Sequence, residues 1–202
     1  TDGFIMKFSG GGNLVWSTYY GGSNMDRTSS VQTDKSGNVF VCGVTSSTNL
    51  PVLNAGTYFK GSISGISQDM FILKFDNSAT LKWGTYYGGT RNDQHYEYDN
   101  LAIDTCGNVF FGFTTNSRNV PFQLACDSGG MFDNTIDTST STTNNSVYLS
   151  RFSNTGVLMW STLFGGDGNS FRTTLGADRF GYVFYSGEWN GVQDTSSYPT
   201  MW

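Results

Sequence analysis

The side chains best suited to chemistry gather around His95, the single histidine of the chain. A serine hydrolase would need a serine and an orienting carboxylate brought to it from elsewhere, and no Gly-x-Ser-x-Gly elbow marks a nucleophile. Glu97 and Glu188, the only glutamates, offer little to a glycosidase, which needs two carboxylates at a set separation. We therefore expect no catalytic residue and no cofactor. The group can instead stack and hydrogen bond, and the candidate partner-binding residues are Arg91, His95, Tyr96, Glu97, Tyr98 and Arg118.

Aspartates could still supply a carboxylate pair, but many stand at turn positions, where the side chain caps the backbone. Asp34, Asp104 and Asp178 each precede a glycine by three positions, which is the pattern of a β-turn. Calcium loops bring several oxygen ligands together, whereas each of these turns has one carboxylate. We predict structural turns here and no metal site.

The three cysteines are Cys42, Cys106 and Cys126, so at least one is unpaired within the chain. Cys106 and Cys126 are expected at opposite ends of a strand, too far apart for a disulfide. A bridge between Cys42 and Cys126 and a set of three free thiols both remain open. The chain has no Cys-x-x-Cys, which disfavours a zinc site.

A unit of roughly 70 residues, repeated three times, positions these side chains. Its clearest phrase is an aromatic strand around Trp16, Trp83 and Trp160, which are 67 and 77 positions apart. A double glycine ends each copy of the phrase, at Gly21-Gly22, Gly88-Gly89 and Gly165-Gly166. Repetition on this scale predicts stacked modules whose loops absorb the differences in length.

Each unit also carries a first strand and a hairpin. The first strands contain Lys7, Lys74 and Arg151 in one matched column, and the hairpins contain the three turn aspartates. The runs are short, rich in β-branched and aromatic residues, and bounded by Gly, Asn, Asp and Ser, which is typical of strands. We predict four strands per unit, twelve in all, and no helix. For the basic column, a repeated salt bridge or cover for an apolar neighbour is favoured over a basic ring.

Side-chain alternation predicts that the strands are covered on both faces. Trp16 and Tyr20 share one face of their strand, while Tyr19, Tyr86 and Leu163 place apolar rings and chains on the other. Four-stranded sheets packed face to face around an axis are the blades of a β-propeller. A stacked β-solenoid is the alternative, but its rungs are usually much shorter. The expected fold class is all-β, a propeller of four-stranded antiparallel blades.

The repeated phrases resemble those of the bacterial SBBP β-propeller repeat family. The likeness rests on Trp16-Ser-Thr-Tyr-Tyr-Gly-Gly22, Asp34-Lys-Ser-Gly-Asn-Val-Phe-Val-Cys-Gly43, Thr45-Ser-Ser-Thr-Asn-Leu-Pro51 and Asp69-Met-Phe-Ile-Leu-Lys-Phe75. It implies a secreted or surface-attached bacterial protein, commonly of the Bacteroidetes group and exported by type IX secretion. The third unit departs from the pattern at Tyr182 and at Glu188-Trp189.

The repeats span residues 1–68, 69–145 and 146–202. Three are fewer than the four to eight blades of a closed propeller, so we expect an incomplete propeller domain from a longer polypeptide. If the Asp-to-Gly-Asn hairpin is the innermost pair of each blade, the chain holds two whole blades flanked by two halves.

The charge and the apolar content of the chain exclude some classes of binding partner. Charged residues make up 13% of the chain and the net charge is −5, which argues against the basic footprint of a nucleic-acid binder. No apolar run reaches the roughly 18 residues of a membrane span. We expect no nucleic acid and no membrane-spanning segment.

Strand alternation also predicts where partners bind. Short turns should gather at one end of the blades and long, divergent connections at the other, where binding residues concentrate. Lesser candidates there are Tyr58, Phe59 and Phe132, which could equally pack under the loops. We expect a non-enzymatic structural or interaction module, adhesin-like or filament-like, that binds a protein or a surface glycan or joins a surface assembly. The alternatives are a carbohydrate-active enzyme that uses loop carboxylates and a type IX cargo captured with its transporter.

Overall fold

The computed structural model describes residues 1–54, 58–63, 67–94, 100–124, 145–164 and 169–190. Within these ranges the chain forms thirteen β-strands and no helix, so none that could cross a membrane. The strands are β1 (Gly3–Phe8), β2 (Leu14–Tyr20), β3 (Asp26–Thr33), β4 (Val39–Thr45), β5 (Asp69–Phe75), β6 (Leu81–Tyr87), β7 (Asp93–Gln94), β8 (Leu101–Ile103), β9 (Val109–Thr115), β10 (Ser146–Phe152), β11 (Leu158–Phe164), β12 (Asn169–Ala177) and β13 (Val183–Asn190).

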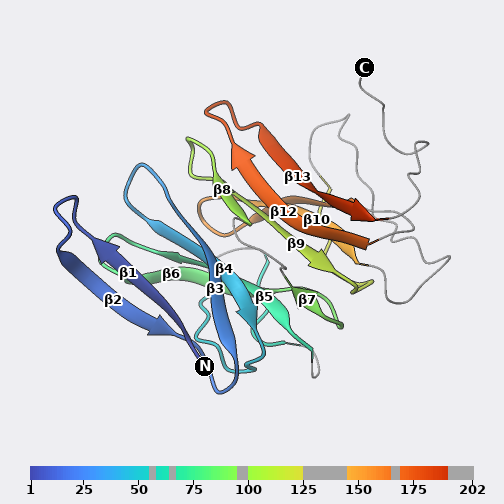
Figure 1. The fold of residues 1–202 in the computed structure, drawn as a ribbon, viewed down its shortest axis with the longest axis horizontal. Coiled ribbons are helices and arrows are strands. Elements are labelled where there is room, and N and C mark those ends of the chain that lie inside the picture. Colours follow the sequence, from blue (N-terminus) through green and yellow to red (C-terminus); the bar gives the residue numbers. More distant parts are fainter. Residues whose placement is uncertain (55–57, 64–66, 95–99, 125–144, 165–168, 191–202) are drawn as a thin grey trace.

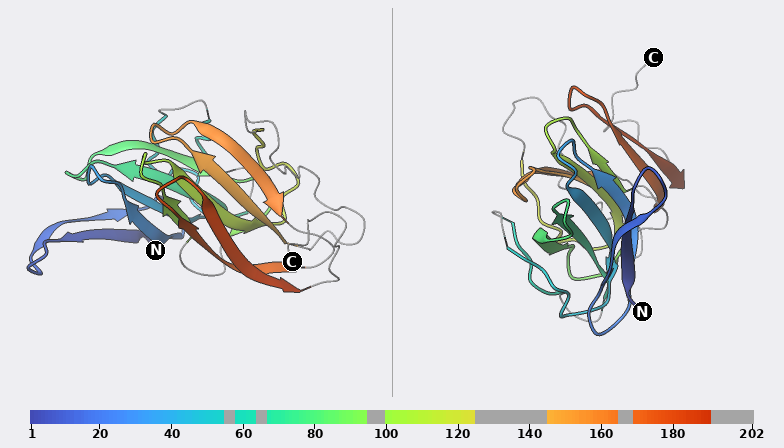
Figure 2. Two further views of the ribbon diagram at one scale, coloured as in Figure 1. Left: turned by 90° about the horizontal axis from the view of Figure 1, so that it is seen from above. Right: turned by 90° about the vertical axis from the view of Figure 1, so that its left-hand side faces the viewer.

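The strands form four antiparallel sheets that follow one another in chain order (Figure 1). Strands β3 to β6 form the first whole blade in the order β3-β4-β5-β6. The second blade runs β11-β10-β9-β7, with β8 also paired to β9. The half-blades β1–β2 and β12–β13 lie at the two ends of the series (Figure 2). The all-β class and its four-stranded blades are confirmed, and the blade phase is two whole blades between two halves.

The expected total of twelve strands is wrong by one. In the second blade, β7 and β8 both pair with β9, and together they occupy the place that the single strand β3 has in the first blade. An insertion between them separates the two pieces in the sequence. Repetition predicted the strand but not this interruption, because the interruption occurs in one unit only.

Among the described residues, six short turns gather at one end of the blades (Figure 1), which we call the turn end. Asp34 accepts hydrogen bonds from the amides of Ser36 and Asn38 at 2.9 and 3.0 Å, and Asp104 does the same in the second blade. Gly37 then adopts a φ of +77°, in the left-handed region that favours glycine. Asp178 accepts two amide bonds in the same way in the last hairpin. The aspartate at the start of each of these three turns thus satisfies backbone donors.

The core lies between the sheets, and tryptophan is central to it. Trp83 is 4% exposed and stands between Phe40 of its own blade and Phe152 of the next, with ring centroids 6.2 Å away in each case. A second cluster fills the space between β1–β2 and the first blade and includes Tyr20 and Phe71. Blades covered on both faces are therefore held together by burial of apolar side chains.

Polar contacts between neighbouring blades repeat along the chain. The indole N–H of Trp16 donates to the backbone oxygen of Asn77 at 3.2 Å, and that of Trp83 donates to the backbone oxygen of Asn154 at 3.0 Å. The ammonium groups of the two lysines in the basic column contact the side-chain oxygens of the same two asparagines.

Of the roles favoured for the basic column, cover for an aromatic neighbour recurs at Lys74 and Arg151, whereas among the described residues of this column a salt bridge occurs only at Arg151. Lys74 lies over the Phe40 ring at 5.2 Å. Arg151 forms a salt bridge with Asp104 at 3.4 Å and lies over the Phe110 ring at 5.5 Å. Each of these two long side chains therefore covers an aromatic ring of the adjacent strand while its charged end meets an oxygen at the turn end.

Candidate functional site

At the end opposite the turns, which we call the loop end, an equivalent buried carboxylate holds the loops of each whole blade together. Asp26, the first residue of β3, accepts hydrogen bonds from the Gly22 amide at 2.6 Å and the Ser47 hydroxyl at 2.8 Å, and from the Thr45 hydroxyl. Only 1% of the surface of Asp26 is exposed. A buried carboxylate is stable only with such donors.

The second blade repeats this arrangement at Asp93. Its acceptor oxygens receive the Gly89 amide at 2.7 Å, the Ser117 hydroxyl at 3.1 Å and the Thr115 hydroxyl. A Cβ at Gly89 would lie 2.4 Å from the Ser117 Cβ, so the second glycine of the repeated pair allows the two loops to meet. The double glycine thus serves a close approach between loops.

Sequence reasoning missed these carboxylates, although a signal was present. Two phrases of the chain hold them: Gly-Gly-x-x-x-Asp, ending at Asp26 and Asp93, and Thr-x-Ser-x-Asn, starting at Thr45 and Thr115. The phrases are about 20 residues apart in both of these units, so neither by itself predicts a contact.

The asparagine that ends the second phrase joins the same two loops. Asn119 accepts hydrogen bonds from the amide and the hydroxyl of Thr90, both at 3.0 Å. Next to it, the Ser117 hydroxyl accepts the Arg91 amide at 2.9 Å. The structure therefore brings together the backbone segments that carry the predicted partner-binding residues Arg91 and Arg118, and both residues are exposed.

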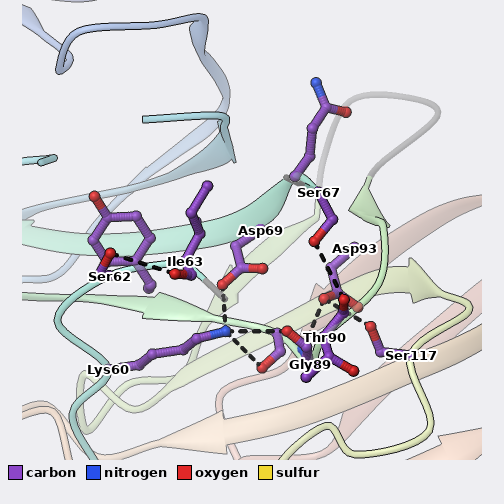
Figure 3. Close-up of polar contacts among 12 residues, drawn as sticks. Lys60, Ser62, Ile63, Ser67, Asp69, Gly89, Thr90, Asp93 and Ser117 are labelled. Carbon is purple, nitrogen blue, oxygen red and sulfur yellow. Dashed lines mark hydrogen bonds and ion pairs between the residues drawn. The ribbon is translucent and has the colours of Figure 1, made fainter. Parts of the chain in front are cut away.

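A lysine links this loop end to the start of β5 (Figure 3). The Lys60 ammonium donates to Asp69 and to the backbone oxygens of Gly88 and Gly89, at 3.1 and 3.2 Å for the last two. The Asp69 carboxylate is fully buried, whereas the Lys60 side chain keeps 17% of its surface exposed. One cation thus neutralises a carboxylate and satisfies the carbonyls of the double glycine.

Burial sets the protonation of the two neighbouring carboxyls. Desolvation raises the pKa of Asp93 to about 7, although its three donors favour the charged form and the nearby Asp69 adds to the rise. Desolvation also raises the pKa of Asp69, against the hydrogen bond and the charge of Lys60. Near neutral pH the loop end of the second blade therefore titrates.

These carboxyls cannot act on a substrate as they stand. Asp69 and Asp93 have no exposed surface, and a general acid or nucleophile must reach the reacting atoms. Within the described ranges no group of three or more His, Cys, Asp or Glu side chains could hold a metal ion. The arrangement is suited to fixing loop backbones in place.

Part of the long connection that follows β4 covers the edge of the blade instead of standing at the loop end. Leu53 bridges Gly84 of β6, and the Tyr86 amide donates to the Lys60 backbone oxygen at 3.1 Å. In the second blade the Ser161 amide donates to the Gln123 oxygen at 2.9 Å. Each connection thereby protects an outer edge strand that could otherwise pair with another chain.

The remaining candidates divide between packing and positions outside the described residues. Tyr58 packs edge-on against Tyr87, with ring centroids 4.9 Å apart, so it is a packing residue beneath the loops. Phe59 is 39% exposed. The predicted residues that lie outside the described ranges are His95, Tyr96, Glu97, Tyr98, Cys126, Phe132, Gly165 and Gly166.

The other two cysteines are free thiols, Cys42 buried and Cys106 exposed. Burial raises the pKa of Cys42 to about 12, which keeps it as an inert thiol in the core. Neither serves the loop end.

Comparison with known proteins identifies a family that part of the chain resembles. No curated protein matches the chain. The model of one family, described as a beta-propeller repeat and abbreviated SBBP, matches residues 15–51, which contain nearly all of β2 and the whole of β3 and β4. The matched segment holds the Trp16 strand, the double glycine, the Asp34 turn and the Thr-x-Ser-x-Asn phrase. The resemblance predicted from the repeated phrases is confirmed over residues 15–51, and this match agrees with the four-stranded antiparallel sheets of a β-propeller module.

Proposed function

We propose that this propeller module is a non-enzymatic, secreted or cell-surface interaction scaffold that binds a protein or surface glycan at its loop end. The observation that carries the proposal is the paired hydrogen bonding of Arg91 and Thr90 to Ser117 and Asn119, which holds two exposed arginines on neighbouring loops. Loops whose backbone is already fixed bind a partner at a lower cost in conformational entropy. The type IX secretion route and a Bacteroidetes source, which the resemblance implies, belong to this proposal.

The two ends of the blades differ in a way that favours the loop end. Turns are short and repeat nearly the same hydrogen bonds in every unit, whereas the loops differ in length and sequence. Side chains that vary on a constant scaffold are typical of binding surfaces. Guanidinium groups supply planar donors for carboxylates or sulfates of a partner.

Binding to an array of neutral and acidic bacterial surface glycans tests the proposal. The chain is expected to bind a subset of them, and the double variant Arg91→Ala/Arg118→Ala is expected to bind at least roughly tenfold more weakly, as the loss of two charge-assisted contacts implies. Lys35→Ala, which removes an exposed cation at the turn end, is the matched control and should bind like the parent. Equal loss in both variants, or none in either, would place binding elsewhere.

The enzyme alternative is tested on the same preparation. Incubation of the chain with the glycans that it binds should release no product, because the carboxyls with raised pKa values are buried. Turnover that disappears in the arginine double variant would refute a purely binding role. Co-purification with a transport complex, and with no glycan bound, would instead favour the cargo alternative.

A further inference from the structure

The two whole blades join their loops with the same set of hydrogen bonds, which we call the loop frame. In the first blade, Asn49 accepts the Ser23 amide at 2.9 Å and the Ser23 hydroxyl at 3.0 Å. The Ser47 hydroxyl accepts the Asn24 amide at 2.8 Å. The equivalent bonds of the second blade are 2.9 to 3.0 Å long, and the buried carboxylate of each blade receives the same three donors. One loop geometry therefore occurs twice at the loop end.

Two positions of each loop frame, which we call the exposed pair, carry exposed side chains that differ between the blades. One is the middle x of the Gly-Gly-x-x-x-Asp phrase, Asn24 or Arg91, and the other precedes the asparagine of the Thr-x-Ser-x-Asn phrase, Thr48 or Arg118. The bond that both blades make at the first position uses the backbone amide, which any residue except proline supplies. The Asn24 side chain adds one bond, to the Ser46 backbone oxygen at 3.1 Å. The loop frame therefore accepts different side chains at the exposed pair.

The exposed pair is neutral in the first blade and doubly cationic in the second. The Arg91 amide is bonded to Ser117, the residue before Arg118, so the two arginines stand on adjoining loops. Like charges on adjoining loops repel each other, and an anion that contacts both removes this repulsion. Guanidinium groups bind carboxylates and tetrahedral oxyanions through paired hydrogen bonds. The second blade therefore has the groups for an anion site, and the first blade does not.

The surroundings of the two arginines are polar and favour a glycan over a protein as the source of the anion. Thr90, Asn92 and Asn119 are exposed beside them and offer hydroxyl and amide groups, which can hydrogen bond to sugar hydroxyls. The four loops of the two blades are residues 21–25, 46–50, 88–92 and 116–120. Among these described residues, no large apolar side chain is exposed, whereas the centre of a protein interface is usually rich in apolar and aromatic side chains.

We propose that the exposed pair determines what each blade binds, and that Arg91 and Arg118 give the second blade a site for the carboxylate or sulfate group of an acidic glycan. The pair Asn24 and Thr48 leaves the first blade without an anion site. The inference rests on the proposed function, because it takes the loop end as the binding surface. It adds that ligand preference moves with the exposed pair, since the loop frame is the same in both blades.

Binding to dextran sulfate, carboxymethyl dextran and dextran, measured by biolayer interferometry, tests the class of ligand. The three polymers share one backbone and carry sulfates, carboxylates and no charge, so the acidic polymer that binds identifies the anion. The parent should bind at least one acidic polymer more tightly than dextran. Arg91→Asn/Arg118→Thr, which gives the second blade the exposed pair of the first, should weaken that binding at least roughly tenfold.

Two outcomes would overturn the anion site. One is a parent without preference for either acidic polymer, and the other is an affinity for the acidic polymers that the exchange leaves unchanged. Neither outcome contradicts the proposed function while the parent still binds neutral glycans of the array. A parent that binds no glycan and no protein contradicts both.

Transfer of the exposed pair to the first blade tests whether the pair, and not the blade, determines the ligand. In the Arg91→Asn/Arg118→Thr background, Asn24→Arg/Thr48→Arg should raise the affinity for the acidic polymer at least roughly tenfold again. The physical reason is that the loop frame of the first blade holds these positions as the second blade does. No recovery in this variant would overturn the transfer of preference.

Ser36→Arg/Ser78→Arg in the same background is the matched control. It adds the same charge at two exposed positions of the turn end, outside the loop frame. This variant should stay as weak as its background. Recovery equal to that of the transfer variant would mean that net charge alone attracts the polymer, and it would overturn the proposal.

Discussion

Replacing Asp93 with asparagine is expected to remove a pH dependence that this carboxyl gives to the stability of the chain. The pKa of Asp93 is raised from 3.8 to about 7 by burial, so the folded chain holds this proton more tightly than the unfolded chain. Stability is therefore greatest below about pH 4 for this group and falls as the pH rises towards 7. Each tenfold change in acidity constant is worth about 1.4 kcal/mol, which gives a fall of about 4 kcal/mol.

Urea unfolding, followed by circular dichroism between about pH 4 and pH 8, measures this effect. The amide introduced at this position would resemble the protonated carboxyl, so Asp93→Asn and the parent should have similar stability near pH 4 and diverge as the pH rises. The difference in unfolding free energy between them should change by about 4 kcal/mol, in favour of the variant at high pH. Asp69→Asn should move the window to lower pH, because Asp69 contributes to the raised pKa of Asp93.

Asp76→Asn is the matched control for this series. Asp76 lies in an exposed turn, and hydrogen bonds from the Thr80 and Ser78 amides lower its pKa. Any stability that it contributes is present above its unfolded pKa and is lost only as the pH falls below that range. The difference between this variant and the parent should stay constant from about pH 5 to about pH 8. The reasoning about burial is refuted if the Asp93 difference is equally constant.

Three further substitutions test the contacts around this site and between the blades. Lys60→Met should lower the free energy of unfolding in urea by about 3–5 kcal/mol at about pH 8, because it leaves Asp69 buried without its cation. The loss should be smaller at about pH 4, where Asp69 can be protonated. An equal loss at both pH values would contradict the ion pair. Gly89→Ala should lower stability by about 1–3 kcal/mol, since the added carbon would meet a serine side chain at 2.4 Å, whereas Gly176→Ala, with nothing within 4 Å, should be tolerated. Trp83→Phe keeps an aromatic ring but loses the indole bond to the next blade, and a cost well below about 1 kcal/mol would show that this bond contributes little.

The repeated parts of the fold could be predicted from the sequence because a motif that recurs in each unit has the same structural environment in each unit. The Asp34 turn is an example: the aspartate, the glycine three positions later and the positive φ belong to one short segment. The burial of both faces of the Trp83 strand was predictable in the same way, from the alternation of its side chains. When the residues that form a turn or strand are close in sequence, their pattern can be recognised, and three copies of it make the prediction stronger.

Contacts that join distant segments were not predictable in this way. Asp93 meets Thr115 and Ser117 across 22 and 24 positions, and although both phrases also occur around Asp26, neither indicates that the two segments touch. Lys60 reaches Asp69 from a connection that the other units do not repeat. The split of one strand into β7 and β8 is likewise particular to one blade. Features that occur once lack the internal copies against which a pattern can be checked.

The third unit shows that the parts of the buried carboxylate site change together. In the whole blades, Asp26 lies opposite Thr45 and Asp93 lies opposite Thr115. At the corresponding positions of the last hairpin, Ser170 lies opposite Trp189. A buried carboxylate needs hydrogen-bond donors around it. Where the carboxylate is absent, the threonine that would donate to it has no acceptor there. The sequence of the third unit therefore lacks both the carboxylate and the threonine of this site. Its turn end keeps the Asp178 bonds unchanged, which is expected if the turns fix the blade and the loop end is free to diverge.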